Sequence, residues 1–299
     1  MSVPVSAQTA PRGGLVVVAL LLVYVVWGST YLGIHLALES GLPPLSVISG
    51  TRFVIAGGLL YALLRWRGVA APTRAQWPTL GVMGFCLLFL GNGMVVMAER
   101  DVSSGLAAVA VASVPLWMAL FSAFRGERPT RGEWLGIGIG FAGVLWLNAG
   151  SSLTATPAGL VFLLIAPLGW AAGSIWSRGR DLPSPFMTAA AQMLCGGVIL
   201  VAGGLLRGER MDMLPNLQGV LSVGYLTVFG SIIGFTAYVW LLQNVRPVLA
   251  SSYAYVNPVI AVALGAWIAH ERFSAADIGA MAVILAGVVV ITLARVRRT

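Results

Sequence analysis

Uncharged polar and aromatic side chains occur at intervals inside stretches of this sequence that are otherwise apolar. The ten that form a candidate substrate-binding set are Trp27, Thr30, Tyr31, Asn92, Trp117, Trp170, Ser174, Tyr238, Tyr253 and Asn257. Hydrogen-bond donors and acceptors set among aromatic walls suit a cavity for a small, partly apolar solute. Any one of these residues could instead join two helices through a hydrogen bond or simply fill volume. The prediction therefore depends on the whole set and not on a single member.

Arg52 is the one arginine that lies inside an apolar stretch. A charge at such depth in a membrane is costly and by default suggests a function. Its guanidinium could bind a substrate carboxylate, or it could hold its helix to neighbouring carbonyl groups or to Glu99. The ten carboxylates all fall in predicted loops or at predicted helix ends. Because proton-driven pumps usually carry an acid inside the membrane, we expect downhill transport or a coupling route that the sequence does not reveal.

The sequence contains no other reactive constellation. It has no phosphate-cradling glycine loop, no cluster with metal-ligand spacing and no nucleophile with a nearby base. Its two cysteines, Cys86 and Cys195, both fall within apolar stretches. We therefore predict no metal, no cofactor and no enzymatic activity.

The composition is that of an integral membrane protein. Of the 299 residues, 58% are hydrophobic and only 9% are charged, and the mean hydropathy is +0.90. This leaves too little polar surface for a soluble globule. The net charge of +8 comes from 18 basic residues, all arginines, and they do not form the patch that nucleic-acid binding requires. The predicted partners are a small solute and the lipid bilayer, and nucleic acid is not among them.

Ten apolar segments can be marked off as predicted membrane spans. A hydrocarbon core about 30 Å thick needs roughly 20 residues of helix, and helices satisfy their backbone groups in lipid. The spans are Leu15–Leu38, Pro44–Leu64, Pro78–Ala98, Ser103–Phe124, Gly132–Asn148, Pro157–Trp176, Phe186–Leu206, Gln218–Leu241, Leu249–Ala269 and Asp277–Ala294. The predicted fold is an all-α membrane protein with ten transmembrane helices.

Arginines are distributed unequally over the two sides of such a bundle. With ten spans, the termini and the even-numbered loops carry 13 arginines, whereas the odd-numbered loops carry 4. Cytoplasmic loops are the ones that carry an excess of Lys and Arg. Both termini are therefore predicted to be cytoplasmic.

The sequence repeats itself once. GERPTRGEWLGIGIGFAGV (126–144) aligns without gaps with HERFSAADIGAMAVILAGV (270–288), and a shift of 143 residues pairs Trp27 with Trp170, Gly91 with Gly234, and Pro115 with Pro258. Each copy holds five predicted helices, at 15–148 and 157–294. Because five crossings is an odd number, the second copy enters the membrane from the opposite face. The sequence thus predicts two inverted-topology five-helix repeats.

Interrupted helices at matched positions of two inverted repeats point to a transport site near the middle of the membrane. Pro115 and Pro258 are such a pair, each about 9 to 12 residues into its predicted span, and each is expected to kink its helix. Trp27 and Trp170 lie at a similar depth. Glycines at every fourth position (132, 136 and 140, and 230 and 234) favour close helix packing, within the chain or in a dimer.

These features, in this order, resemble the EamA-type branch of the drug/metabolite transporter superfamily. They are the two five-helix repeats, WGSTY (27–31) echoed by WAAGS (170–174), RF (52–53) echoed by QM (192–193), and the paired segments that end in AGV. Within that branch the sequence is similar to bacterial amino-acid exporters, including those for aromatic amino acids. The resemblance covers residues 15–294 and implies a ten-helix transporter of the bacterial inner membrane, with a central cavity between the halves and helices 5 and 10 at the periphery.

Two other functions stay open at this point. A multidrug exporter for lipophilic cations could use the aromatic residues through cation–π contacts, although the small four-helix relatives use a first-helix glutamate that is missing here before Glu39. A membrane scaffold or sensor would need no cavity between Trp27 and Trp170. The solute, the direction of transport, and the choice between monomer and dimer are not determined by the sequence.

Overall fold

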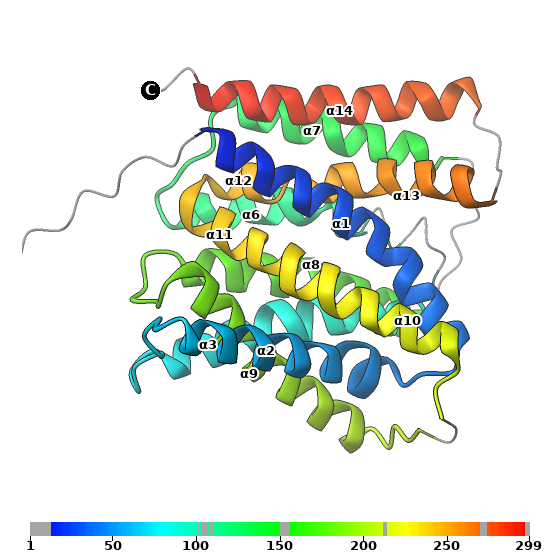
Figure 1. Cartoon of the computed structure of the whole chain (residues 1–299). Helices are drawn as coiled ribbons and strands as arrows, with labels where there is room; N and C mark the ends of the chain where they lie inside the picture. Colours follow the sequence, from blue (N-terminus) through cyan, green and yellow to red (C-terminus); the bar gives the residue numbers. More distant parts are fainter. Residues whose placement is uncertain are drawn as a thin grey trace, which may run out of the picture.

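The computed structural model describes residues 13–100, 102, 107, 110–149, 156–211, 214–269 and 274–296. The regular structure of these residues is helical, and they contain no β-strand. The helices lie side by side in one elongated bundle (Figure 1). The prediction of an all-α fold is confirmed.

The helices of the two halves follow each other in a similar order. The first half contains α1 (Gly13–Glu39), η1 (Pro44–Thr51), α2 (Arg52–Trp66), α3 (Trp77–Met83), η2 (Gly84–Gly93), α4 (Met94–Ala98), α6 (Val114–Phe124) and α7 (Arg131–Leu147). The second half contains α8 (Pro157–Ser177), α9 (Pro185–Leu206), α10 (Leu217–Tyr225), η3 (Leu226–Phe235), α11 (Thr236–Asn244), α12 (Pro247–Ala250), α13 (Tyr253–Ala269) and α14 (Ala275–Val296). The elements η1, η2 and η3 are π-helical and run directly into the α-helices beside them.

Seven helices of the described residues are long and apolar enough to cross a membrane. They are Gly13–Glu39, Pro44–Trp66, Trp77–Ala98, Pro157–Ser177, Pro185–Leu206, Leu217–Asn244 and Ala275–Ala294. The other predicted spans are shorter: α7 and α13 have 17 residues each, and the fourth is described as a helix of residues 110–124. Residues 103–106, 108 and 109 of that fourth span lie outside the described residues. The total of ten spans stays a prediction.

Of the two matched prolines, Pro258 lies inside its helix, as predicted, whereas Pro115 does not. Pro115 lies in the first turn of α6, where its missing N–H removes no helix hydrogen bond. Pro258 lies inside α13, but the chain breaks earlier, at the turn of Ser251 and Ser252 between α12 and α13. The segment in the second half is therefore divided before its proline and not at it.

Helices α7 and α14 begin with the same local structure. The Thr130 hydroxyl accepts a hydrogen bond from the Glu133 N–H, and the Glu133 carboxylate accepts one from the Thr130 N–H. Ser274 and Asp277 form the same reciprocal pair. These capping boxes fall at positions that the sequence alignment pairs.

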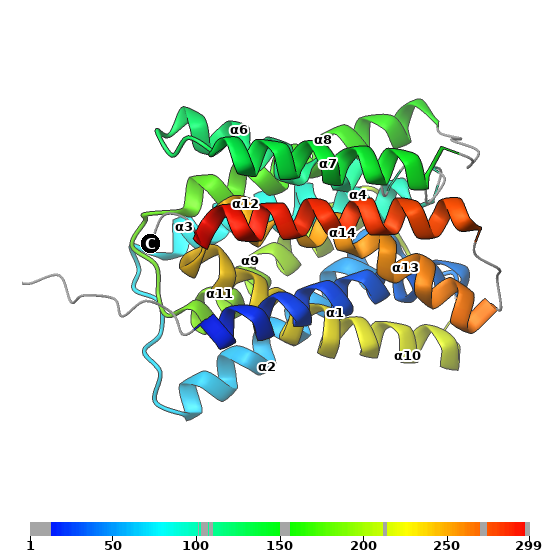
Figure 2. The same ribbon diagram turned by 90° about the horizontal axis from the view of Figure 1, so that it is seen from above.

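These two helices also pack against each other along one side of the bundle, in both views (Figures 1 and 2). A Cβ atom on Gly287 would lie 2.5 Å from the backbone nitrogen of Gly140 and 2.9 Å from the carbonyl oxygen of Gly136. No side chain fits at this distance, so glycine permits the close approach of the two backbones. The glycine spacing of the predicted fifth helix serves packing within one chain.

The two halves of the chain are joined at both ends of the bundle. At one end, Arg125 donates a hydrogen bond to the Ile175 carbonyl, and the Arg246 Nε lies 2.9 Å from the Glu133 carboxylate. We call this the arginine end; α1 begins and α14 ends there (Figure 1). At the opposite end, the Glu209 carboxylate accepts hydrogen bonds from two backbone N–H groups at the start of η1. We call this the Glu209 end.

Candidate substrate cavity

A cavity of about 90 Å³ lies inside the bundle and is lined by both halves of the chain. Eight residues singled out in the sequence line it: Trp27, Thr30, Tyr31, Arg52, Asn92, Trp170, Tyr253 and Asn257. They come from α1, α2, η2, α8 and α13. Segments far apart in the sequence therefore bring most of the predicted set to one place.

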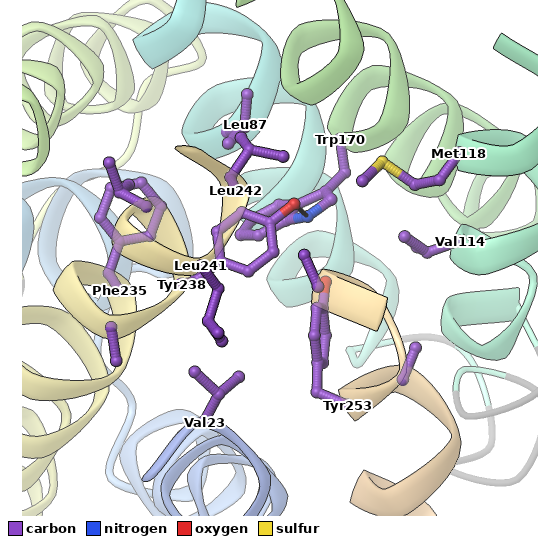
Figure 3. Close-up of a cluster of buried hydrophobic side chains, with 14 of the residues drawn as sticks. Val23, Leu87, Val114, Met118, Trp170, Phe235, Tyr238, Leu241, Leu242 and Tyr253 are labelled. Carbon is purple, nitrogen blue, oxygen red and sulfur yellow. Dashed lines mark hydrogen bonds between the residues drawn. The ribbon is translucent and has the colours of Figure 1, made fainter. Parts of the chain in front are cut away.

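Four aromatic rings meet at one side of the cavity. The rings of Trp27, Trp170, Tyr238 and Tyr253 form the aromatic cluster, and every pair among them has ring centroids 4.7–6.4 Å apart. Trp27 meets Trp170 edge-on, with their planes at 83°, a favourable geometry for aromatic pairs. Figure 3 shows Trp170, Tyr238 and Tyr253 converging from three different helices. The two matched tryptophans thus meet each other.

Each tryptophan of the cluster packs on a glycine from the opposite half of the chain. A Cβ atom on Gly234 would lie 2.6 Å from Trp27 Nε1, and one on Gly91 would lie 2.6 Å from Trp170 Cε3. These glycines lie in η3 and η2, which occupy matching positions in the two halves. π-Helical turns are rare and often mark functional sites. Each indole therefore packs directly against the backbone of a glycine, at a position where no larger residue would fit.

Tyr238 and Ser174 support the cluster from behind and do not line the cavity. Tyr238 is fully buried. Its hydroxyl accepts a hydrogen bond of 2.9 Å from Trp170 Nε1 and lies 2.8 Å from the Ser174 hydroxyl. Tyr238 thus holds the Trp170 indole by a hydrogen bond, and Ser174 contacts Tyr238. Their predicted contact with substrate stays a prediction.

Trp117 is also absent from the cavity wall. Helix α6 begins at Val114, which does line the cavity, and then runs to Arg125 at the arginine end. Trp117 thus lies about 5 Å further along the helix and packs against Phe121, with ring centroids 6.2 Å apart. The two predicted kink prolines, 115 and 258, do not line the cavity either.

Arg52 is the charged group of the cavity wall, and its side chain is only 3% exposed. Its Nη2 donates a hydrogen bond of 2.8 Å to Asn92 Oδ1, and its guanidinium carbon lies 4.5 Å from the centre of the Phe53 ring. Its Nε has no hydrogen-bond partner. Arg52 therefore retains a donor for a further acceptor.

Asn257 brings an unsatisfied acceptor to the same cavity. It is 2% exposed, and its Oδ1 has no partner within hydrogen-bonding distance. It lies one turn after Tyr253 in α13, on the face that the spacing of four residues predicts. A buried carbonyl oxygen without a donor is costly, so a donor on a bound solute would be favoured here.

Some residues of the cavity were missed in the sequence. Phe53, Phe235, Gly230 and Pro167 line the cavity. Pro167 lies inside α8, and an interrupted helix in the second repeat is the same signal that drew attention to the other prolines. Phe53 belongs to the RF motif but was not assigned to the site, and Phe235 carries no comparable signal, because apolar side chains fill every span.

Glu99 lies at a helix end, as predicted, and its charge interacts with Arg52, one of the partners that the sequence suggested for that arginine. Its Oε1 is buried without a hydrogen-bond partner.

No group of three His, Cys, Asp or Glu side chains that could hold a metal ion occurs in the described part of the chain.

The fold and the cavity define a helical membrane protein of two repeats that enclose a polar and aromatic site. The model of the EamA-like transporter family matches residues 14–149 and again residues 157–293, so the chain belongs to this family. This confirms the resemblance to the EamA-type branch that was noted in the sequence.

Relatives agree with this assignment. Over 278 residues the chain is 45% identical to the "Uncharacterized inner membrane transporter YedA" of Escherichia coli (strain K12), covering 93% of this chain and 90% of the relative. An "Uncharacterized transporter" of Archaeoglobus fulgidus is 23% identical over 259 residues, covering 85% of this chain and 89% of the relative. A solved crystal structure that is 23% identical superposes with a TM-score of 0.77 and covers 96% of this chain and 99% of its own. That structure supports the fold alone.

Proposed function

We propose that the protein is a multi-pass transporter of the bacterial inner membrane that exports amino acids or related small metabolites. The single observation that carries the proposal is the cavity, in which Arg52 and Asn257, each with an unpartnered polar atom, lie among aromatic rings. The name of the E. coli relative supports the inner membrane, and the resemblance to amino-acid exporters supports the direction.

The cavity offers complementary groups for each part of an amino acid. The free donor of Arg52 suits the α-carboxylate, since hydrogen bonds between ionised partners are the strong ones. The Asn257 Oδ1 suits the ammonium group, which donates and does not accept. The faces of Trp27, Trp170 and Tyr253 suit an apolar or aromatic side chain. The solute would thus satisfy the two polar atoms that the empty protein leaves unpaired.

Alternating access requires that the cavity open to each side in turn. Helix α1 begins at the arginine end, whereas its counterpart α8 ends there, beside Arg125. This opposite course, with the reciprocal tryptophan–glycine contacts, supports inverted repeats that rock about the aromatic cluster. We take the arginine end and both termini as cytoplasmic, by the excess of arginine.

The cavity extends from the aromatic cluster toward the Glu209 end, because its other lining residues, such as Ile34 and Val95, lie later in α1 and α4. Opening to the cytoplasm would have to separate the rings of the cluster. It would also have to loosen the contacts between the halves at the arginine end, which include the Arg125–Ile175 hydrogen bond and the Arg246–Glu133 ion pair.

The two alternative functions fit the cavity less well. A lipophilic cation would meet the positive charge of Arg52 in the cavity wall, and like charges in a buried site repel strongly. A scaffold or sensor would have no use for a cavity with unpaired polar atoms, which are costly to keep. Inhibition of amino-acid exchange by a quaternary ammonium compound would favour the cation exporter.

Counterflow in liposomes tests the proposal. Purified protein, preloaded with one unlabelled amino acid from a panel, should take up the labelled form of the same compound. Asn257→Ala should lower the exchange rate by up to about tenfold, because one hydrogen bond contributes roughly 0.5–1.5 kcal/mol. Trp170→Ala should lower it further, since it also removes a wall of the cavity.

Matched controls keep the result specific. Trp176→Ala removes a tryptophan near the end of the same helix, where it stacks with Arg180, and Asn244→Ala removes an asparagine that binds only the Trp240 carbonyl one turn earlier. Both controls should exchange like the wild type. Exchange by the cavity variants at the rate of these controls would refute the assignment of the site.

A further inference from the structure

Glu99 has a buried carboxylate oxygen with no partner. The residue lies just beyond the span that ends at Ala98, and its Oε1 makes no hydrogen bond. Such a group is costly when ionised and much less so when protonated. Burial raises the pKa of the Glu99 carboxyl to about 8, although the positive charge of Arg52 lowers it. The protonation of Glu99 therefore changes near neutral pH.

Glu99 stands between the central cavity and the Glu209 end of the bundle. It lines a second hollow of about 450 Å³ at that end, and the residue is partly exposed there. Its charge also acts on Arg52 and Tyr31, which line the central cavity. A proton can reach Glu99 from the end of the bundle, and the charge of Glu99 is felt in the cavity.

The other charged or titratable groups around this hollow are paired or exposed. They are His35, Glu39, Arg100, Glu209 and Arg210. His35 Nε2 lies 3.2 Å from the Glu39 carboxylate, and both side chains are more than half exposed. The Glu209 carboxylate accepts hydrogen bonds from the backbone of η1, and both arginines are exposed. The buried charge that Glu99 balances is therefore that of Arg52.

We propose that Glu99 is a proton-binding site linked to the solute: a solute carboxylate binds at Arg52 when Glu99 carries a proton. This inference rests on the proposed function, in which Arg52 receives that carboxylate. When Glu99 is ionised, it already balances Arg52, and a second carboxylate would leave a net negative charge in a buried site. When Glu99 is protonated, Arg52 is left to attract the solute.

Linkage makes the effect reciprocal. A proton on Glu99 strengthens solute binding, and the solute strengthens proton binding by the same factor. The effect acts on binding from either face of the membrane, and the direction of flux then follows from the gradients of solute and proton. Because proton and solute bind together, they cross together, so an inward proton gradient favours uptake and export runs down the solute gradient.

The pH dependence of binding to the purified full-length protein tests this inference. The probe is labelled phenylalanine or, if that gives no counterflow, the amino acid of the panel that does. Above the pKa of Glu99, the dissociation constant should rise by up to about tenfold per pH unit, and below it the constant should level off. Binding near that pKa should also take up a fraction of a proton per solute from a weakly buffered solution, approaching about one at higher pH.

Two variants identify the group that titrates. Glu99→Gln is neutral like the protonated acid, so it should bind with the low-pH affinity of the wild type at every pH and take up no proton. Glu39→Gln removes an exposed acid at the same end of the bundle and should keep the wild-type pH dependence.

The outcomes separate the two proposals. Binding by the wild type that does not vary with pH, or a Glu99→Gln variant that keeps the wild-type slope, would overturn the role of Glu99. Should the glutamine variant fail to fold, proton uptake by the wild type decides the question alone. The absence of both binding and counterflow for every amino acid at every pH would overturn the proposed function, and this inference with it.

Discussion

Replacing Gly234 by alanine tests whether Trp27 needs the glycine beneath it. The added Cβ atom would lie 2.6 Å from Nε1 and 2.9 Å from Cδ1 of the indole. Non-bonded heavy atoms pack at about 3.5–4.0 Å, so the indole has to move by about 1 Å. It has little freedom to do so, because Trp170, Tyr238 and Tyr253 surround it.

The energetic cost follows from this displacement. Overpacking a filled site costs about 1–3 kcal/mol. The movement also strains the hydrogen bond of 3.1 Å from Trp27 Nε1 to the Gly230 carbonyl, which contributes roughly 1 kcal/mol. If about 1.4 kcal/mol of this cost destabilises the solute-bound state relative to the empty state, the affinity for the solute drops about tenfold. We expect a lower unfolding temperature and about tenfold slower exchange for Gly234→Ala.

Thermal unfolding in detergent and counterflow in liposomes measure the two effects. Gly224→Ala is the control, since it lies in the same continuous helix and its Cβ would meet no atom within 4 Å. The pair Gly91→Ala and Gly81→Ala repeats the comparison in the first half, where position 81 is equally open. Trp27→Phe, combined with the alanine at 234, should restore part of the stability. If Gly234→Ala behaved like Gly224→Ala in both assays, the packing argument would be wrong.

Three other contacts give simpler predictions. Glu133→Ala should lower the unfolding temperature more than Asp277→Ala, because the first acid is buried and ion-paired whereas the second makes only an exposed capping box; equal shifts would contradict this. Tyr238→Phe removes a buried hydroxyl that binds two side chains and should cost about 1–3 kcal/mol in chemical denaturation, so an unchanged free energy of unfolding would speak against these bonds. Gly287→Ala should cost about 3 kcal/mol, since its Cβ meets backbone at 2.5 Å, whereas Gly138→Ala, which faces open space inside α7, should leave stability unchanged or raise it by up to about 1 kcal/mol in the same experiment.

Features that extend over the whole chain could be predicted from the sequence. The membrane class follows from composition, and the repeat follows from an alignment that pairs Thr130 with Ser274, both of which cap a helix in the structure. The contact between Trp27 and Trp170 is consistent with the same repeat. In two inverted copies of one unit, equivalent residues that lie near the common axis also lie near each other.

Depth within the bundle could not be predicted as well. Val114 and Trp117 belong to one apolar stretch of the sequence. In the structure α6 begins at the cavity, so Val114 lines it, whereas Trp117 lies one turn further along the helix and does not. The sequence places Glu99 at the end of its span and names it as a possible partner of Arg52, but it does not show how deeply the carboxyl group is buried. Its burial depends on how other segments pack around it, and its charge interacts with that of Arg52, 47 residues earlier. The π-helical turns of η2 and η3 have no periodic pattern that would reveal them.

The exchange of tryptophan and glycine between the halves limits how the gene can change. Each half supplies one tryptophan and one glycine of the two contacts, Trp27 with Gly234 and Trp170 with Gly91. A substitution at one of these positions therefore alters the packing of the other half, and the two halves cannot change independently there. The same reciprocity means that a protein cut between its repeats retains matching surfaces on both fragments. Two copies of one half, placed antiparallel, would each carry one such tryptophan and one such glycine.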